Sequence, residues 1–322
     1  MEKFMTWMET HMMPVAAKLG NNKYLKAISS GFIAVMAATI VGSMFTLIGN
    51  LPITAWTNWL AETGLNQLLA LPGQCTTDLI AIYAVFFIAY SLAQSFNVDG
   101  AGAGLSCLVS FFIITGRTAY YTAAATDAAT VSAMATTYLG AKGLFSAMII
   151  ALVGARLYVS VVKKGWVIKL PDSVPPNVAN SFSSLIPAGV VVILFVVLRF
   201  LCTLTPYGDL HTMIFTIIQS NLMRFIGNNV WSWLFFNVMT CLLWFFGLHG
   251  GNIVGSITNP IYTPLSLENL AAFQAGEKTM PYIITGAFTK SFTFGGVGSM
   301  FGLAILMCFF AKSKQYKTLG KL

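Results

Sequence analysis

The sequence predicts an all-α polytopic membrane protein with about seven or eight membrane segments. Of its 322 residues, 57% are hydrophobic and 9% are charged, whereas charged residues make up about 25% of a typical soluble domain. The mean hydropathy of the chain is +0.76. The apolar residues also gather in runs that approach the ~20 residues a helix needs to cross a bilayer. These runs cover residues 29–51, 77–96, 100–115, 143–162, 184–204, 231–246 and 292–311.

Basic residues flank these runs and predict their orientation. The first 28 residues contain four lysines, so the positive-inside rule places the N-terminus in the cytoplasm. Residues 52–76 are predicted to form a loop, and because they contain no Lys or Arg they fit the outer side. Three lysines in residues 163–169 and four in the C-terminal tail fit the inner side. The net charge of +8 is therefore read as a topology signal, and no nucleic-acid partner is expected.

The number of crossings leaves one conflict, which concerns residues 247–267. Seven crossings from a cytoplasmic N-terminus would put the lysine-rich tail outside. An eighth crossing through this broken stretch, which is rich in Gly, Asn and Pro, removes the conflict. The alternative is a re-entrant hairpin in the same stretch together with an external tail.

Two polar stretches predict amphipathic helices that lie in the membrane interface. Residues 205–227 carry several polar side chains, His211 among them, while the apolar residues between 213 and 218 have helical spacing. The first residues of the chain show a similar pattern. Residues 122–137 are rich in Ala and Thr and predict an external loop.

Three local features also give expectations. Asp99 follows a tight turn and predicts the N-cap of the next helix. Arg199 lies in an apolar run and is expected to reach toward the membrane interface. Prolines predict a stiff connector without a regular helix at Pro171, Pro175 and Pro176.

The best candidate for a site is the point where the sixth apolar run breaks. Residues 231–246 are followed at once by Gly-Leu-His-Gly-Gly-Asn, which places His249 among glycines at the end of a long apolar segment. A polar group there survives only if it is buried in protein or lines a cavity. Its imidazole offers one donor and one acceptor, which suits a sugar hydroxyl. The alternative is a histidine that holds two helices together through hydrogen bonds.

Three neighbours of His249 are candidate sugar-binding residues. The ring of Trp244 can stack on the apolar face of a sugar or belong to an interfacial aromatic belt. Asn252 and Asn259 are candidate partners for hydroxyl groups, although Asn259-Pro260 is also typical of a turn. The five cysteines lack metal-ligand spacing and no nucleotide-binding motif is present, so neither a metal nor a cofactor is expected.

Three segments together resemble a known family: TTYLGAKGLF, KLPDSVPPNVANSFSSLIPA and WFFGLHGGNI. They resemble the membrane IIC component of the phosphoenolpyruvate-dependent sugar phosphotransferase system, of the lactose, cellobiose and diacetylchitobiose type. The resemblance extends from the N-terminus to Leu322, and the proline-rich segment is its most specific part. It implies a homodimer in the bacterial cytoplasmic membrane that takes up a β-linked disaccharide. A separate IIB protein, phosphorylated on cysteine, would supply the phosphoryl group.

The resemblance also implies roles for parts of this chain. Residues 1–204 would form the dimerising transmembrane bundle, and residues 205–322 the substrate-binding region. His249 corresponds to the family's catalytic and sugar-binding histidine, Trp244 to a tryptophan of the binding site, and residues 163–183 to a cytoplasmic loop. Family members carry a further Asn-Glu-Pro motif, whose glutamate faces the histidine across the sugar. This sequence lacks that motif, so a C-terminally truncated, incomplete site is expected.

The predicted function is therefore that of a permease subunit for the phosphorylation-coupled uptake of a β-linked disaccharide. The chain would not phosphorylate the sugar alone, because the separate IIB protein would be the phosphoryl donor. One alternative is a secondary sugar transporter that does not phosphorylate its cargo. The other is an inactive remnant that only dimerises.

Overall fold

The computed structural model describes most of the chain. It describes residues 6, 10, 11, 14, 17, 18, 20–51, 53–115, 118–121, 130–134, 136–171, 173–245, 250–292 and 300–321. Almost all of its regular structure is helical, as predicted. The exception is a small antiparallel hairpin of β1 (Thr118–Tyr121) and β2 (Thr130–Ala133), which pairs Thr118 with Ala133. This hairpin falls where the sequence predicted an external loop, and residues 122–129 lie outside the described residues.

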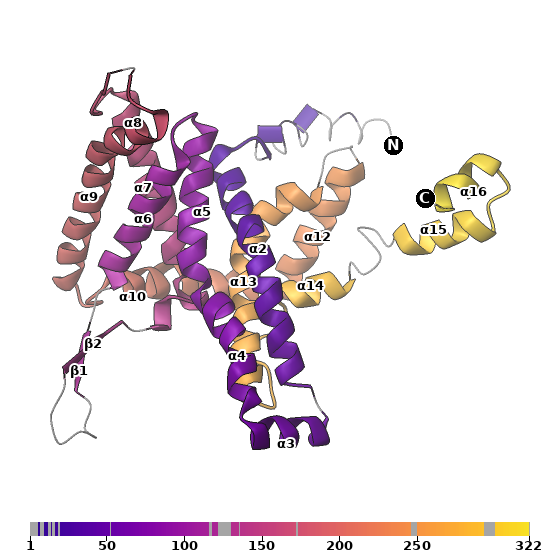
Figure 1. The fold of residues 1–322 in the computed structure, drawn as a ribbon. Coiled ribbons are helices and arrows are strands. Elements are labelled where there is room, and N and C mark those ends of the chain that lie inside the picture. Colours follow the sequence, from indigo (N-terminus) through magenta and orange to yellow (C-terminus); the bar gives the residue numbers. More distant parts are fainter. Residues whose placement is uncertain are drawn as a thin grey trace.

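A bundle of long helices forms the first part of the chain (Figure 1). The helices packed in this bundle are α2 (Lys23–Gly49), α4 (Leu65–Thr76) continued by η1 (Thr77–Leu79) and α5 (Ile80–Ser95), α6 (Gly100–Thr115), α7 (Leu144–Lys163) and α9 (Leu185–Thr203). Four described helices are long and apolar enough to cross a membrane: Lys23–Gly49, Leu65–Ser95, Ala141–Lys163 and Val178–Thr203. Helices α6 and α12 (Val230–Phe245) are apolar but shorter. The helices predicted from the first six apolar runs are confirmed.

Short helices connect and extend this bundle. Among the connections are α3 (Thr54–Thr63), η2 (Thr136–Tyr138), η3 (Ala141–Gly143) and α8 (Pro176–Ser183). The second part of the chain begins with α10 (Leu210–Ile214), the π-helical η4 (Phe215–Gln219), α11 (Ser220–Leu222) and the π-helical η5 (Met223–Gly227). It continues with α12 (Val230–Phe245), α13 (Gly250–Gln274), α14 (Gly286–Phe292), α15 (Met300–Phe309) and α16 (Lys314–Lys321). Figure 1 shows α15 and α16 side by side, away from the bundle.

One aromatic ring marks an end of the bundle. The ring of Phe96, just after α5, has Lys23 Nζ at 4.2 Å, Arg156 Cζ at 4.9 Å and Lys163 Nζ at 5.2 Å from its centroid. Lys23 Nζ also donates to the carbonyl oxygen of Ser95 at 2.6 Å. Cations are attracted both to ring faces and to helix C-termini. We call this the basic end of the bundle; α3 and the β hairpin lie at the opposite end (Figure 1).

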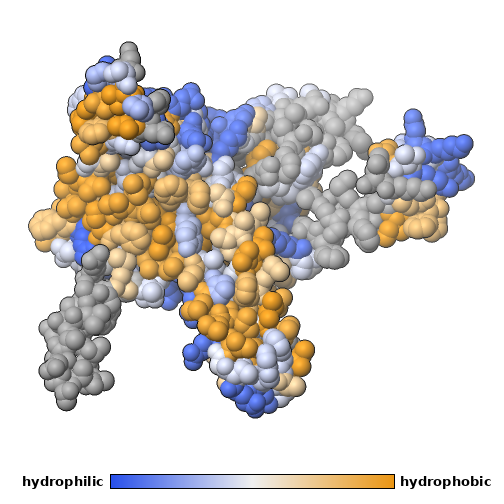
Figure 2. Space-filling model, in the orientation of Figure 1, coloured by the Kyte–Doolittle hydropathy of each residue, from blue (hydrophilic) through white to orange (hydrophobic). Residues whose placement is uncertain are grey.

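Apolar side chains occupy both the inside and the outside of the bundle. Helix α5 buries Ala84, Val85 and Ile88 completely. Helices α2 and α9 instead turn large apolar side chains outward, such as Leu47 and Phe200, which are 62% and 63% exposed. Figure 2 shows this apolar surface across the middle of the molecule, with hydrophilic residues gathered toward the ends. Such a surface suits lipid tails, which offer nothing to polar groups.

Close helix contacts within the bundle depend on glycine. A Cβ atom added to Gly31 of α2 would lie 2.8 Å from the backbone nitrogen of Ile88 in α5. Helices in membranes associate largely through such small residues, because lipid is as apolar as leucine.

We expect Gly31→Ala to force α2 away from α5. Overpacking of this kind costs about 1–3 kcal/mol, and the thermal unfolding temperature in detergent should fall accordingly. Gly189→Ala in α9 is the matched control, because no described atom lies within 4 Å of its added Cβ. Equal unfolding temperatures for the two variants would contradict this account of the α2–α5 contact.

Of four local predictions, the structure corrects three and confirms one. Residues 52–76 were predicted as a loop, but they form α3 and α4, because α4 packs along α2. Pro176 does not prevent a helix, since it opens α8 at a position where its missing N–H is not needed. Arg199 does not reach outward: its guanidinium donates to the carbonyl groups of Ile113 and Ile114 at the end of α6. Asp99 caps α6 as predicted, accepting from two backbone N–H groups there.

Candidate functional site

The corner between α12 and α13 contains the described part of the predicted sugar site. Helix α13 begins at Gly250, the residue after His249. A Cβ atom on Gly250 would overlap the carbonyl oxygen of Thr240 in α12 and lie 3.0 Å from Cδ1 of Trp244. Only glycine therefore allows the two helices to meet so closely. The structure brings Trp244, 40% exposed, next to the start of α13.

The other predicted site residues are placed as follows. His249 lies outside the described residues, as do residues 246–248. The backbone of Asn252 is in the first turn of α13. Asn259 is exposed and lies nine residues after Gly250, which is about 14 Å along a helix. Trp244 and Gly250 are thus brought together, and Asn259 is not placed beside them.

The stretch predicted as broken is instead a helix. Residues 250–274 form α13 without interruption, and both Pro260 and Pro264 lie inside it. The alternative prediction, a turn at Asn259-Pro260, is therefore wrong. The position of α13 in the fold explains the difference, because it packs against α2, α12 and α14, and tertiary packing can offset the ~3 kcal/mol cost of an internal proline.

Side-chain bonds tie the segment after α13 back onto it. Asn269 in α13 donates from Nδ2 to the carbonyl of Tyr282 at 2.7 Å and accepts from the Tyr282 N–H at 3.0 Å. The Tyr282 hydroxyl donates to Glu268 at 2.8 Å. Burial first, and then this neighbouring carboxylate, raise the pKa of Tyr282 to about 12. The loop before α14 is therefore fixed to one face of α13.

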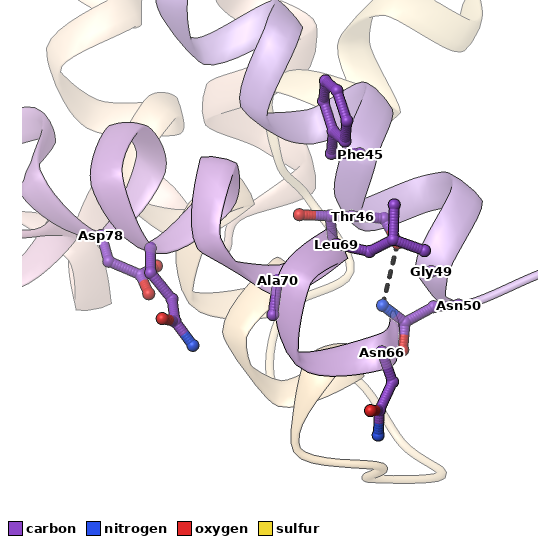
Figure 3. Close-up of a pocket in the computed structure, with 9 residues that line it drawn as sticks. Phe45, Thr46, Gly49, Asn50, Asn66, Leu69, Ala70 and Asp78 are labelled. Atoms are coloured by element: carbon purple, nitrogen blue, oxygen red, sulfur yellow. Dashed lines mark hydrogen bonds between the residues drawn. The ribbon is translucent and has the colours of Figure 1, made fainter. Parts of the chain in front are cut away.

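A polar pocket between α2 and α4 was not predicted (Figure 3). It has a volume of about 320 Å³ and is lined by Phe45, Thr46, Gly49, Asn50, Asn66, Leu69, Ala70, Gln74 and Asp78. Figure 3 shows Asn50 bonded to Thr46 above Asn66, with Asp78 at the far side of the pocket. Asp78 belongs to the candidate span Leu65–Ser95. Reading residues 52–76 as a loop hid this pocket, although an ionisable residue next to an apolar run is itself a signal of function.

His211 lies at the centre of a second unpredicted cluster. It is 1% exposed, stacks on Tyr138 at 4.8 Å between ring centroids, and has its Nε2 3.0 Å from Thr115 Oγ1. The Thr115 hydroxyl donates to the carbonyl of Phe111. Thr115 therefore accepts from His211, and Nε2 carries the imidazole proton. His211 Nδ1 is a buried acceptor without a partner among the described residues.

We expect acid to destabilise the protein through His211, which lies outside the candidate spans. Burial lowers the pKa of His211 from 6.5 to about 4, against the opposing charge of Asp209. The unfolded chain therefore takes up a proton between pH 6.5 and 4 that the folded chain does not, so stability falls as pH falls. The unfolding temperature in detergent should drop between pH 7.5 and 5, and it should drop less in His211→Phe. Equal drops in the two proteins would remove His211 as the cause.

An apolar helical bundle with polar pockets inside it is the architecture of an integral membrane permease. The chain belongs to the EIIC family of the phosphotransferase system: the model of that family, "Phosphotransferase system, EIIC", matches residues 29–322. Among the described residues, no group of three or more His, Cys, Asp or Glu side chains could hold a metal ion.

Similarity to individual proteins extends over essentially the whole chain. It is 36% identical to a cellobiose-specific EIIC component of Geobacillus stearothermophilus, over 100% of this chain and 73% of that protein. It is 33% identical to an oligo-beta-mannoside-specific EIIC component of Bacillus subtilis (strain 168), over 97% and 70%. The crystal structure of ChbC, the IIC component of an N,N'-diacetylchitobiose-specific system, matches with a TM-score of 0.89 at 34% identity, over 98% of this chain and 74% of that one.

Proposed function

We propose that this chain is the permease subunit for uptake and phosphorylation of a β-linked disaccharide of the cellobiose class. The observation that carries the proposal is the 36% identity to a cellobiose-specific EIIC component over 100% of the chain. The sugar would bind at the corner between α12 and α13. Trp244 stacks on the sugar ring there, and Asn252 in the first turn of α13 bonds its hydroxyl groups. His249 binds the hydroxyl that becomes phosphorylated and helps to remove its proton.

The orientation and the partner follow from charge. The basic end, with Lys23 and Lys163, faces the cytoplasm of the bacterial cell. The loop between Lys163 and α8 also exposes Trp166, with Lys164 Nζ 5.6 Å from its ring. A basic surface with an exposed aromatic ring suits an acidic soluble partner. We assign this surface to docking of the phosphorylated IIB protein.

In this proposal the two parts of the chain have different roles. Residues 1–204 form a membrane bundle that pairs with a second copy through outward apolar faces such as those of α2 and α9. Residues 205–322 carry the sugar-binding corner. Chemical cross-linking in native membranes tests the pairing, and a monomer at all protein concentrations would contradict it.

The function is tested in membrane vesicles that contain the chain and are supplied with phosphorylated IIB protein and labelled cellobiose. The expected product is cellobiose phosphate. Accumulation of free cellobiose would instead identify a transporter without phosphorylation. Dimers that bind no cellobiose would identify a non-transporting protein.

A further inference from the structure

A second polar pocket lies far from the corner where the sugar is proposed to be phosphorylated. We call it the outer pocket; it has a volume of about 330 Å³ and is lined by Thr77, Asp78, Thr136, Thr137, Gly140, Ala141, Lys142, Leu267, Glu268 and Ala271. Three segments distant in sequence build it: the break between α4 and α5, the loop through η2 and η3, and the last turns of α13. Its volume falls in the range of ~300–1,000 Å³ typical of small-molecule sites.

Two walls of the outer pocket contact each other directly, and a side chain of the third is fixed by a hydrogen bond. The N–H of Ala81 in α5 donates to the carbonyl of Leu139 in the loop at 2.9 Å. Gly140 passes so close to Asp78 that an added Cβ would lie 2.9 Å from its carbonyl oxygen. On the third wall, Glu268 is fixed by the Tyr282 hydroxyl. A site built on such fixed walls requires little reorganisation when it binds a ligand.

The outer pocket has polar groups that the protein itself does not satisfy. Thr77 is only 5% exposed, and its buried hydroxyl has no hydrogen-bond partner among the described residues. A buried hydroxyl without a partner is costly, and it indicates a missing ligand or water. Asp78 and Lys142 are exposed side chains, and neither forms an ion pair within the described part of the chain. Carboxylates that accept, an ammonium that donates and hydroxyls that do both are the groups that bind a polyhydroxylated sugar.

Helix lengths place the outer pocket at the opposite end of the bundle. Along α13, Glu268 is 18 residues from Gly250, or about 27 Å at 1.5 Å per residue. Along the α5 segment, Thr77 is 18 residues from Ser95, again about 27 Å. Both lengths approach the ~30 Å thickness of the hydrocarbon core. The outer pocket and the sugar-binding corner therefore lie near opposite ends of the bundle.

We propose that the outer pocket is an external binding site that receives the β-linked disaccharide before it moves to the corner at α12 and α13. This inference rests on the proposed function and on the orientation given there. No aromatic side chain lines the pocket, so binding depends on hydroxyl contacts alone. Weak binding suits a first site on a transport path, because the cargo has to leave it again.

The test uses protection of a cysteine from a membrane-impermeant maleimide added outside intact cells. Ala271→Cys places the thiol in the outer pocket, in a background with Cys75→Ser and Cys241→Ser, which removes the two exposed cysteines of the described chain. Cellobiose is expected to slow labelling, whereas mannitol at equal osmolarity is not. The control is Ala61→Cys on α3, which is exposed at the same end and should label without protection.

Variants of the lining residues test the contacts. Thr77→Val and Lys142→Met are each expected to raise about tenfold the cellobiose concentration that halves the labelling rate. This is the effect of losing one hydrogen bond to a buried or charged group. Thr77→Ser keeps the hydroxyl and should protect like the wild type. His249→Ala should leave protection unchanged, because His249 belongs to the other end of α13.

Several results would overturn the inference. These are absence of labelling from outside, labelling without protection by cellobiose, and protection lost in His249→Ala. Protection by sodium or calcium chloride in place of cellobiose would make the outer pocket a cation site. Cellobiose phosphorylation with phosphorylated IIB protein is measured separately in the same membranes. If it proceeds without protection, the outer pocket fails and the proposed function stands.

Discussion

His249→Ala is expected to reduce phosphorylation of a β-linked disaccharide at least about 100-fold, the lower range for losing a positioned proton acceptor. The residue directly precedes α13, whose first turn packs on α12 beside Trp244. Polar groups at membrane depth are retained where they bind cargo. The measurement is the rate of cellobiose phosphate formation in vesicles supplied with phosphorylated IIB protein.

Two further measurements separate a local effect of His249→Ala from misfolding. Dimer formation in cross-linking and the unfolding temperature in detergent should both match the wild type. His249→Gln, which keeps hydrogen-bonding groups but cannot accept a proton at neutral pH, should bind cellobiose and still fail to phosphorylate it. Phosphorylation at the wild-type rate in either variant would remove His249 from the site.

Gly250→Ala is expected to weaken cellobiose binding at least about tenfold. The added methyl group would overlap the carbonyl oxygen of Thr240 and press on the ring of Trp244. Since real Cβ atoms are not found so close to backbone, the start of α13 has to move away from α12. We expect about 1–3 kcal/mol of destabilisation from this overpacking, and a displaced Trp244.

Gly255→Ala is the matched control on the same helix. Its added Cβ would lie 3.5 Å from Nδ2 of Asn259, an ordinary contact. Alanine also favours a helix over glycine by up to about 1 kcal/mol, so stability should be unchanged or slightly higher. Equilibrium binding of labelled cellobiose to both variants decides the matter. Equal affinities would show that the close contact at Gly250 does not shape the site.

Hydropathy predicted the helices well because helices that contact lipid need long runs of apolar residues. The runs at residues 29–51 and 184–204 became α2 and α9, whose outward faces carry residues such as Leu47 and Phe200. The N-cap of α6 was equally predictable, since Asp99 accepts hydrogen bonds from backbone N–H groups only two and three residues ahead in the sequence.

Contacts between segments distant in sequence were the part that could not be predicted. Arg199 binds carbonyl groups that lie 85 and 86 residues earlier in the chain, and no local pattern reveals such partners. The helix at Pro260 and Pro264 depends on packing against α2, α12 and α14, which overrides local propensity. A candidate site near Trp244 was predicted from the glycines around His249, but the close contact of α12 with α13 at Gly250 was not. The outer pocket was missed because its three walls come from separate segments.

The cations around Phe96 have a consequence for the pH dependence of the fold. Three helices, α2, α5 and α7, meet at this ring through Lys23, Ser95, Arg156 and Lys163. Neither a phenyl ring nor a backbone carbonyl titrates, so this attachment has no acidic partner that acid could neutralise. The link between the three helices therefore does not share the pH dependence expected of His211.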